Sequence, residues 1–194
     1  MKVLMRTFVV TAVLLLAACQ DKEPPTYQEQ GYVFGTLVEV SIYGASDDSA
    51  RQAVGLVMQE FQRLQDMLHA WQPSELSELN TALAKGHSLA ISAELVEILN
   101  DVTRVSKQSK HLFNPAIGGL IQLWGFQSDE VRSAQPEEKK VKQLVKQNPL
   151  MSDLKIVRGR VESSNKSVKL DLGGYAKGYA LDRAVDLLRK QGIR

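Results

Sequence analysis

Apolar and polar positions change their spacing sharply within VKLDLGGYAKGYALD, residues 168–182. The first five residues alternate, and a period of two predicts a half-buried strand. Two glycines interrupt the alternation, and from Tyr175 the apolar residues recur at helical spacing. The pattern therefore predicts a strand, a glycine turn and a helix, with a buried helix face formed by Leu181, Ala184, Val185 and Leu188.

The same two periods predict the other elements of the folded part. Alternation predicts strands over residues 32–43, 154–157 and 161–162. Helical spacing and serine caps predict helices over residues 47–68, after Ser74 and after Ser92, and residues 128–147 have the pattern of a charged surface helix. We expect a single α/β (α+β-like) domain over residues 31–194, in which a mixed sheet packs against long helices.

The first residues have the pattern of a targeting segment. Residues 1–18 join a basic start to an apolar stretch too short for an ordinary membrane span, which predicts a signal peptide. They lead into LAAC, residues 16–19, which resembles the bacterial lipobox, where the cysteine receives a lipid. An ordinary signal peptide with an incidental cysteine is the alternative. Lipidation is favoured because Cys19 is the only cysteine and stands where lipoprotein processing needs it.

Residues 19–30 are expected to form the lipidated cysteine and an extended tether, because Pro24 and Pro25 stand among mixed charges there. The domain would then be anchored by its lipid on the periplasmic side of a bacterial membrane. Gln20, directly after the cysteine, leaves the choice between inner and outer membrane open.

Charge and histidine placement exclude some classes of function. The chain has 24 Lys and Arg against 22 Asp and Glu, and loss of Lys2 and Arg6 with the leader leaves 22 against 22. This balance does not suggest a nucleic-acid surface. The three histidines stand alone, without the spacing of a metal site or a catalytic triad.

The glycine turn at residues 173–174 is the candidate site. A strand, two glycines and a helix would point free backbone N–H groups at the positive end of the helix dipole, where an anion is stabilised. Lys177 would add a cation in the first turn, and Asp171 a carboxylate for a hydroxyl or a metal. A plain connection that uses glycines to turn is the alternative on spacing alone, because short glycine motifs are common.

Four separated motifs, in family order, resemble the ApbE family of FAD:protein FMN transferases, bacterial periplasmic flavin transferases; the first is a short one at Phe34. LDLGGYAKGYALDRAV (170–185) is similar to the family's central signature, and KHLFNPAIGGL (110–120), continued by LWGF (123–126), to its second. An aromatic turn with SEL-type residues covers residues 71–80. The resemblance runs from about residue 32 to the end and matches the family's N-terminal and middle portion. It implies a chain that is C-terminally truncated, and a fold incomplete at its C-terminus.

The resemblance implies transfer of FMN from FAD to a threonine or serine hydroxyl of target flavoproteins, with Mg²⁺ as cofactor and AMP as leaving group. The family's targets are flavoproteins of ion-pumping and extracytoplasmic electron-transfer complexes, and the family favours the inner membrane. The family's flavin contacts fall on Phe34, Trp71, Leu112, Phe113, Asn114, Asp171 and Lys177. Gly174 matches the position whose backbone carbonyl helps to hold the metal.

Two other functions remain open. The chain could be a flavin-binding periplasmic lipoprotein without transferase activity, or a structural envelope lipoprotein whose motifs only shape the core. Because the other metal ligands of the family have no counterpart here, we expect residues 20–194 alone to bind flavin weakly at best and to transfer no FMN.

Cys19→Ser tests the lipoprotein interpretation. The substitution removes the only thiol, so the precursor should stay uncut by lipoprotein signal peptidase and should take up no labelled acyl chain. Processing and labelling unchanged from the wild type would contradict it.

Overall fold

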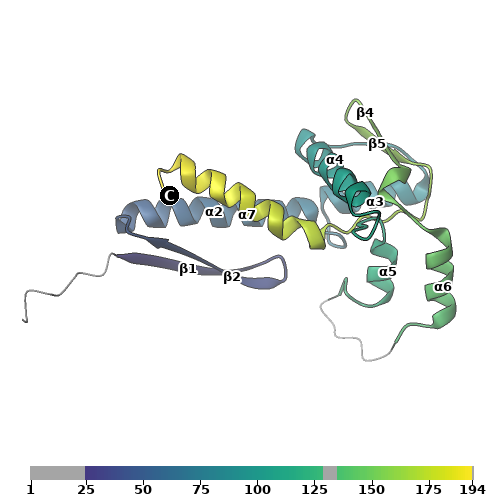
Figure 1. Ribbon diagram of the computed structural model, residues 1–194, viewed down its shortest axis with the longest axis horizontal. Coiled ribbons are helices and arrows are strands. Elements are labelled where there is room, and N and C mark those ends of the chain that lie inside the picture. The colour runs from purple at the N-terminus through teal and green to yellow at the C-terminus, as the bar shows by residue number, and fades with distance from the viewer. Residues whose placement is uncertain (1–24, 129–134, 194) are drawn as a thin grey trace, which may run out of the picture.

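The computed structural model describes residues 25–128 and 135–193. These residues form an elongated arm and a more compact head (Figure 1). The arm consists of β1 (Thr26–Val33), β2 (Thr36–Tyr43), α2 (Asp47–Leu68) and α7 (Gly173–Lys190). The head consists of α3 (Glu75–Lys85), β3 (Leu89–Ala90), α4 (Ala93–Gln108), α5 (Gly118–Leu123), α6 (Glu138–Gln147), the 3-10 turn η2 (Met151–Asp153), β4 (Leu154–Val157) and β5 (Arg160–Ser163).

The predicted strand over residues 32–43 is in fact a hairpin. β1 and β2 pair in antiparallel register, from Thr26 opposite Tyr43 to Val33 opposite Thr36. The two turn residues, Phe34 and Gly35, have φ of 53° and 68°, and positive φ at both positions matches the right-handed twist of the strands. Residues 26–30, expected in the tether, therefore belong to β1, whereas the alternation predicted for β2 is confirmed.

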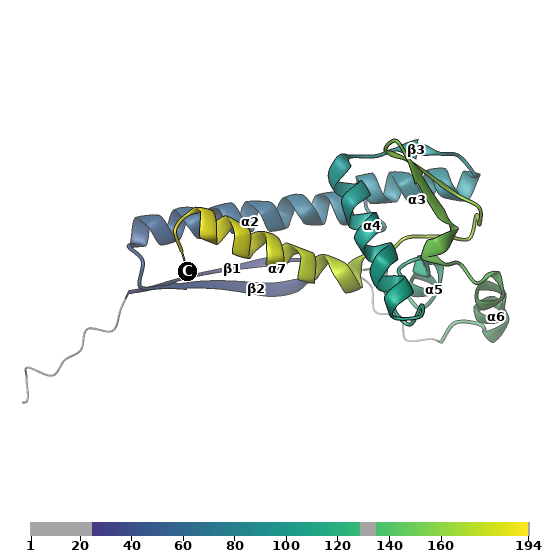
Figure 2. The same cartoon turned by 45° about the horizontal axis from the view of Figure 1, so that its top comes forward.

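Helix α2 forms as predicted, and α7 packs beside it with an unexpected face. The Ser46 side chain accepts a hydrogen bond from the Ser49 backbone and caps α2. The two helices lie side by side along the hairpin in both views (Figures 1 and 2). The buried face of α7 consists of Ala176, Ala180 and Ala184. Alanines four residues apart share one face and leave room for the larger side chains of α2.

The predicted buried face of α7 is only partly correct. Ala184 is buried and Leu188 half-buried, but Leu181 is 61% exposed and Val185 43% exposed. Helical spacing alone could not choose between two neighbouring faces, and the small face was the one that fitted against α2.

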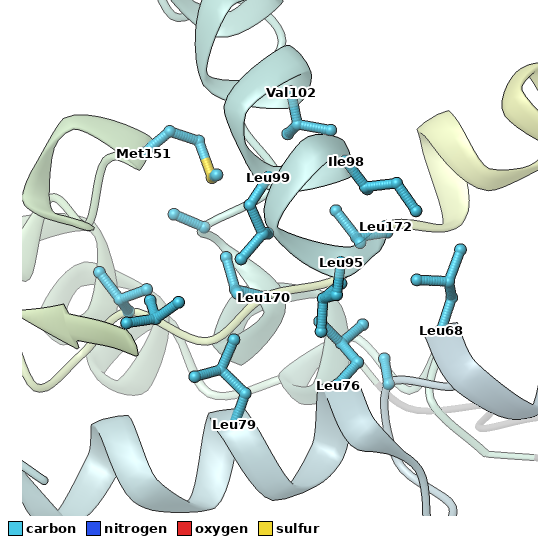
Figure 3. Packing of buried hydrophobic residues seen from close by; sticks show 14 of the residues in the cluster. Leu68, Leu76, Leu79, Leu95, Ile98, Leu99, Val102, Met151, Leu170 and Leu172 are labelled. Atoms are coloured by element: carbon cyan, nitrogen blue, oxygen red, sulfur yellow. The ribbon is translucent and has the colours of Figure 1, made fainter. Parts of the chain in front are cut away.

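The main core lies in the head, where α3 and α4 enclose the segment before α7 (Figure 3). Serine caps begin both helices, as predicted: Ser74 forms a reciprocal capping box with Ser77, and Ser92 accepts from the Leu95 backbone. Completely or almost completely buried side chains fill the interior, among them Leu76, Leu79, Leu95, Leu99, Val102, Met151, Leu170 and Leu172.

The predicted central strand, residues 168–172, is not part of a sheet. Its one bridge joins Lys169 to Ile117 in parallel. Gly118 donates to the Lys169 carbonyl at 2.7 Å, and a Cβ on Gly118 would lie 2.6 Å from that oxygen, so only glycine fits. The next residue, Leu170, is bound by the side chain of buried Asn80, which donates to its carbonyl at 2.8 Å and accepts from its N–H at 2.6 Å.

The α+β character of the fold is confirmed, but the expected mixed sheet is not present among the described residues. The ladders form two small antiparallel sheets, β1-β2 and β3-β5-β4. Strands 154–157 and 160–163 occur where alternation predicted them. Helix α6 begins at Glu138, so the predicted surface helix is shorter than residues 128–147.

A polar network ties α2, α4 and α7 together. Arg63 of α2 donates to both oxygens of Glu94 at 2.8 Å and to Glu60. From α7, Arg183 donates to Glu60 at 3.2 Å and the Tyr179 hydroxyl to Glu94 at 3.1 Å. The hydrogen bonds from Arg63 hold the pKa of both carboxyls below the ordinary glutamate value, against the opposing effect of burial. The network therefore favours one placement of α7 against the other two helices.

The predicted signal peptide, Cys19 and most of the tether lie outside the described residues. Within the described residues, no helix combines the length and apolarity that crossing a bilayer requires.

Asn80→Ala tests whether the Asn80 side chain stabilises the segment before α7. It would leave the buried N–H and C=O of Leu170 without partners, so the free energy of unfolding should fall by about 2–3 kcal/mol in chemical denaturation. Asn100→Ala, on the exposed side of α4, is the matched control and should change stability by no more than about 0.5 kcal/mol. Equal stability of the two variants would show that the Asn80 bridge contributes nothing.

Candidate functional site

A hollow opens where the hairpin tip, the end of α2 and the start of α7 meet. Its cavity volume is about 100 Å³, and the empty space within it, open solvent included, is about 480 Å³. We call it the α7 pocket, and its principal lining residues are Phe34, Gln65, His69, Trp71, Asp171 and Lys177. Four of the residues assigned to flavin from sequence, Phe34, Trp71, Asp171 and Lys177, therefore lie around one cavity.

The hairpin tip is fixed to α2 by a hydrogen bond and a ring contact. The backbone N–H of Phe34 donates to Gln65 Oε1 at 2.6 Å, and its ring meets Phe61 edge-on at 6.2 Å between centroids. The positive φ of Phe34 is therefore held by contacts outside the turn. The hairpin thus supplies an aromatic wall to the pocket.

Trp71 stands in the loop after α2, and His69 shapes that loop. The imidazole Nδ1 of His69 accepts from the backbone N–H groups of Trp71 and Gln72 at 3.5 and 3.1 Å. The two rings meet edge to face, 4.3 Å between centroids. Trp71 is 43% exposed, so a large part of the indole is available to a ligand.

The start of α7 supplies the polar wall. Asp171 Oδ1 accepts from the Gly173 backbone at 3.0 Å, and Oδ2 accepts from Gln127 Nε2 at 2.7 Å. The N–H of Gly174 has no hydrogen-bond partner among the described residues, as expected at a helix start. Lys177, one turn further on, is exposed and makes no ion pair within the described part of the chain. Lys177 and Gly173 line the pocket, and Gly174 is next to them in the first turn. Together with the helix dipole, this N–H and ammonium favour an anion near the start of α7.

The 112–114 motif lies beside the pocket. Phe113 is close to the glycine turn, since its Cε2 is 3.6 Å from where a Cβ of Gly174 would be. Leu112 is 93% exposed. The Asn114 side chain is engaged within the fold: it donates to the Pro149 carbonyl at 2.9 Å and accepts from Ala116 at 3.1 Å. Phe113 therefore lies next to the start of α7, and the Asn114 side chain is already engaged within the fold. As flavin contacts, Leu112, Phe113 and Asn114 stay predictions.

The described residues do not by themselves make a Mg²⁺ site. Gly174, the predicted carbonyl ligand, lies in the first turn of α7, where Asp171 is the nearest predicted carboxylate. No group of three or more His, Cys, Asp or Glu able to hold a metal occurs in residues 25–128 and 135–193. Mg²⁺ prefers near-octahedral oxygen ligands, and one carboxylate with one carbonyl is too small a set.

A second hollow shares Trp71 with the α7 pocket and has a cavity volume of about 450 Å³. Trp71 and Ala70 line both hollows, and the second also contains Lys166 and Lys169. Lys169 donates to Gln122 Oε1 at 2.7 Å. Burial lowers the pKa of its ammonium, and the nearby Asp171 carboxylate partly opposes that shift.

Sequence reasoning missed three polar residues of this region. Gln65 sits on a helix to which the sequence assigned only core packing, and His69 was set aside as an isolated histidine. Gln127 lies 44 positions before Asp171, and nothing in the sequence signalled that they touch. Only a helical face or a short-range motif can be recognised from spacing, and these residues belong to neither.

Comparisons with known proteins agree on one family. The family model described as "ApbE family" matches residues 34–194. The chain is 41% identical over 170 residues to the FAD:protein FMN transferase of Rhodobacter capsulatus, covering 88% of this chain and 32% of that protein. It is 31% identical to the FAD:protein FMN transferase of Chlamydia pneumoniae, over 94% of this chain and 57% of that one.

Solved structures of ApbE proteins have a similar fold. The ApbE protein of Thermotoga maritima superimposes with a TM-score of 0.78 at 22% identity, over 86% of this chain and 53% of that one. The flavin transferase ApbE of Vibrio cholerae superimposes with a TM-score of 0.72 at 21% identity, over 87% and 55%. The chain thus spans about half the length of the solved structures, and between a third and somewhat over half of the two curated relatives.

Proposed function

Because the chain belongs to the ApbE family, we propose that it serves the transfer of FMN from FAD to target flavoproteins. The curated relatives of Rhodobacter capsulatus and Chlamydia pneumoniae carry the name FAD:protein FMN transferase. The observation that carries the proposal is the α7 pocket, in which four residues assigned to flavin from sequence line one cavity.

The two walls of the pocket suit the two kinds of group in FAD. Phe34 and Trp71 offer aromatic surface for stacking on a flat ring. Lys177 and the free N–H of Gly174 offer positive charge to the pyrophosphate. In this proposal Phe113 and Leu112 extend the apolar contact beside the glycine turn, and Asp171 accepts from a donor group of the flavin nucleotide.

The proposed reaction is a phosphoryl transfer. The oxygen of a threonine or serine side chain of the target forms a bond to the phosphorus on the FMN side of FAD. The bond from that phosphorus to the bridging oxygen breaks, AMP leaves with the bridging oxygen, and the hydroxyl proton is released. Lys177 would stabilise the negative charge that grows on the phosphate oxygens, and positioning with charge stabilisation is the main need of such a step.

Mg²⁺ remains part of the proposal, although the described residues do not complete its site. The ion would neutralise pyrophosphate charge when bound. The carbonyl of Gly174 is the one ligand that the family resemblance assigns within this chain.

The proposed place of action is the periplasmic side of a bacterial membrane, with the chain anchored through lipid on Cys19. The family resemblance favours the inner membrane. The targets would be flavoproteins of ion-pumping or extracytoplasmic electron-transfer complexes, and the near-neutral charge balance gives no role to nucleic acid.

The transfer assay separates this proposal from a flavin-binding lipoprotein without transferase activity. The natural gene product is incubated with FAD, Mg²⁺ and a target flavoprotein that carries an accessible threonine. FMN fluorescence should remain on the target band after denaturing electrophoresis, and a chelator or a threonine-to-valine target should abolish it. FAD binding without any labelled target would support the flavin-binding alternative instead.

Lys177→Ala tests the anionic wall. Loss of a charge-assisted hydrogen bond should weaken FAD binding to the natural gene product by about 1–3 kcal/mol in an isothermal titration. Lys190→Ala, an exposed lysine in the last turn of the same helix, is the matched control and should bind like the wild type. A Lys177→Ala isotherm equal to that of the control would place Lys177 on the solvated surface.

A further inference from the structure

Gln127 is the polar side chain whose role the motifs do not explain. It follows α5 and is only 8% exposed, although its neighbour Phe126 is 74% exposed. Its amide nitrogen donates to Asp171 Oδ2 at 2.7 Å, across 44 positions of sequence. Its amide oxygen is buried and has no hydrogen-bond partner among the described residues.

The orphaned oxygen argues against simple packing. A buried acceptor without a partner costs about 1–3 kcal/mol, and an apolar side chain of similar size would fill the same space without that cost. What an apolar residue could not supply is the N–H that reaches the carboxylate. The feature that distinguishes glutamine here is therefore its bond to Asp171.

Two donors hold the Asp171 carboxylate, one on each oxygen. The Gly173 N–H binds Oδ1 from the start of α7, and Gln127 binds Oδ2 from the segment after α5. A carboxylate has about four acceptor positions, so about two remain for a ligand. With one donor removed, the side chain could rotate about its Cα–Cβ bond and turn those positions away from the pocket.

We propose that Gln127 is a positioning residue, which orients the Asp171 carboxylate toward a hydrogen-bond donor of the ligand in the α7 pocket. The inference rests on the proposed function, because it takes that ligand to be FAD. It adds to the proposed site a residue that lies outside the pocket lining and acts through Asp171.

The test is a double-mutant cycle on FAD binding by the natural gene product. Gln127→Leu keeps the volume and removes the donor, so it should weaken FAD binding about tenfold in an isothermal titration. Gln147→Leu, an exposed glutamine at the end of α6, is the matched control and should leave the affinity unchanged. Thermal unfolding should show that Gln127→Leu is as stable as the wild type or more so, because the orphaned acceptor is gone.

The Asp171→Ala background decides whether Gln127 acts through the carboxylate. There, adding Gln127→Leu should change FAD affinity less than about twofold, because the group that it orients is absent. A tenfold effect that persists in this background would overturn the inference and show that Gln127 acts on the ligand by another route. Wild-type affinity of the single Gln127→Leu variant would also overturn it while leaving the proposed function intact. Absence of FAD binding by the wild type would overturn both.

Discussion

The bridge between the Asn80 side chain and the backbone of Leu170 is the interaction on which the candidate site depends. Asn80 is buried in α3, and its amide supplies both a donor and an acceptor to Leu170, which is itself completely buried. The bridge replaces the two bonds that a neighbouring strand would make. Because side chains alternate along an extended segment, fixing Leu170 in the core directs Asp171 to the other side, toward the pocket.

The pocket is assembled from segments that are distant in sequence, and each segment is held in place by a specific direct contact. Gln65 holds the Phe34 turn, and His69 holds the loop of Trp71. The close approach at Gly118 places the loop from residue 115 against the segment that leads into α7. Further away, Arg63, Glu60 and Glu94 connect the helices that carry these segments. The site therefore depends on the relative placement of arm and head.

The electrostatic character of the pocket comes from a few unpaired groups in an otherwise balanced protein. The net charge of the chain is small, so the whole surface exerts little attraction on an anion. At the start of α7, however, a helix dipole acts together with the Gly174 N–H and Lys177, neither of which has a partner among residues 25–128 and 135–193. Asp171 stands on the same wall, and its two oxygens accept hydrogen bonds from Gln127 and from the Gly173 backbone. The wall can therefore present a positive region and a fixed acceptor to one ligand.

The sequence by itself determined the elements whose signals are local. Serine caps and helical spacing placed the starts of α2, α3 and α4, and alternation placed β2, β4 and β5. The glycine motif also located the start of α7, where Asp171 and Lys177 do line one pocket. These signals need only a few neighbouring residues, because caps, periods and turns depend on short-range geometry.

Only the tertiary structure decided the features that depend on which segment pairs with or packs against another. The polar alternation of residues 26–30 has the pattern of a tether until β2 pairs with it. Residues 168–172 have the period of a strand, but a loop and Asn80 take the place of a neighbouring strand. α7 buried its alanines rather than Leu181 and Val185, because the large side chains of α2 pack against the alanine face. The bond from Gln127 to Asp171 joins two segments that only folding brings together, and no spacing along one segment encodes such a contact.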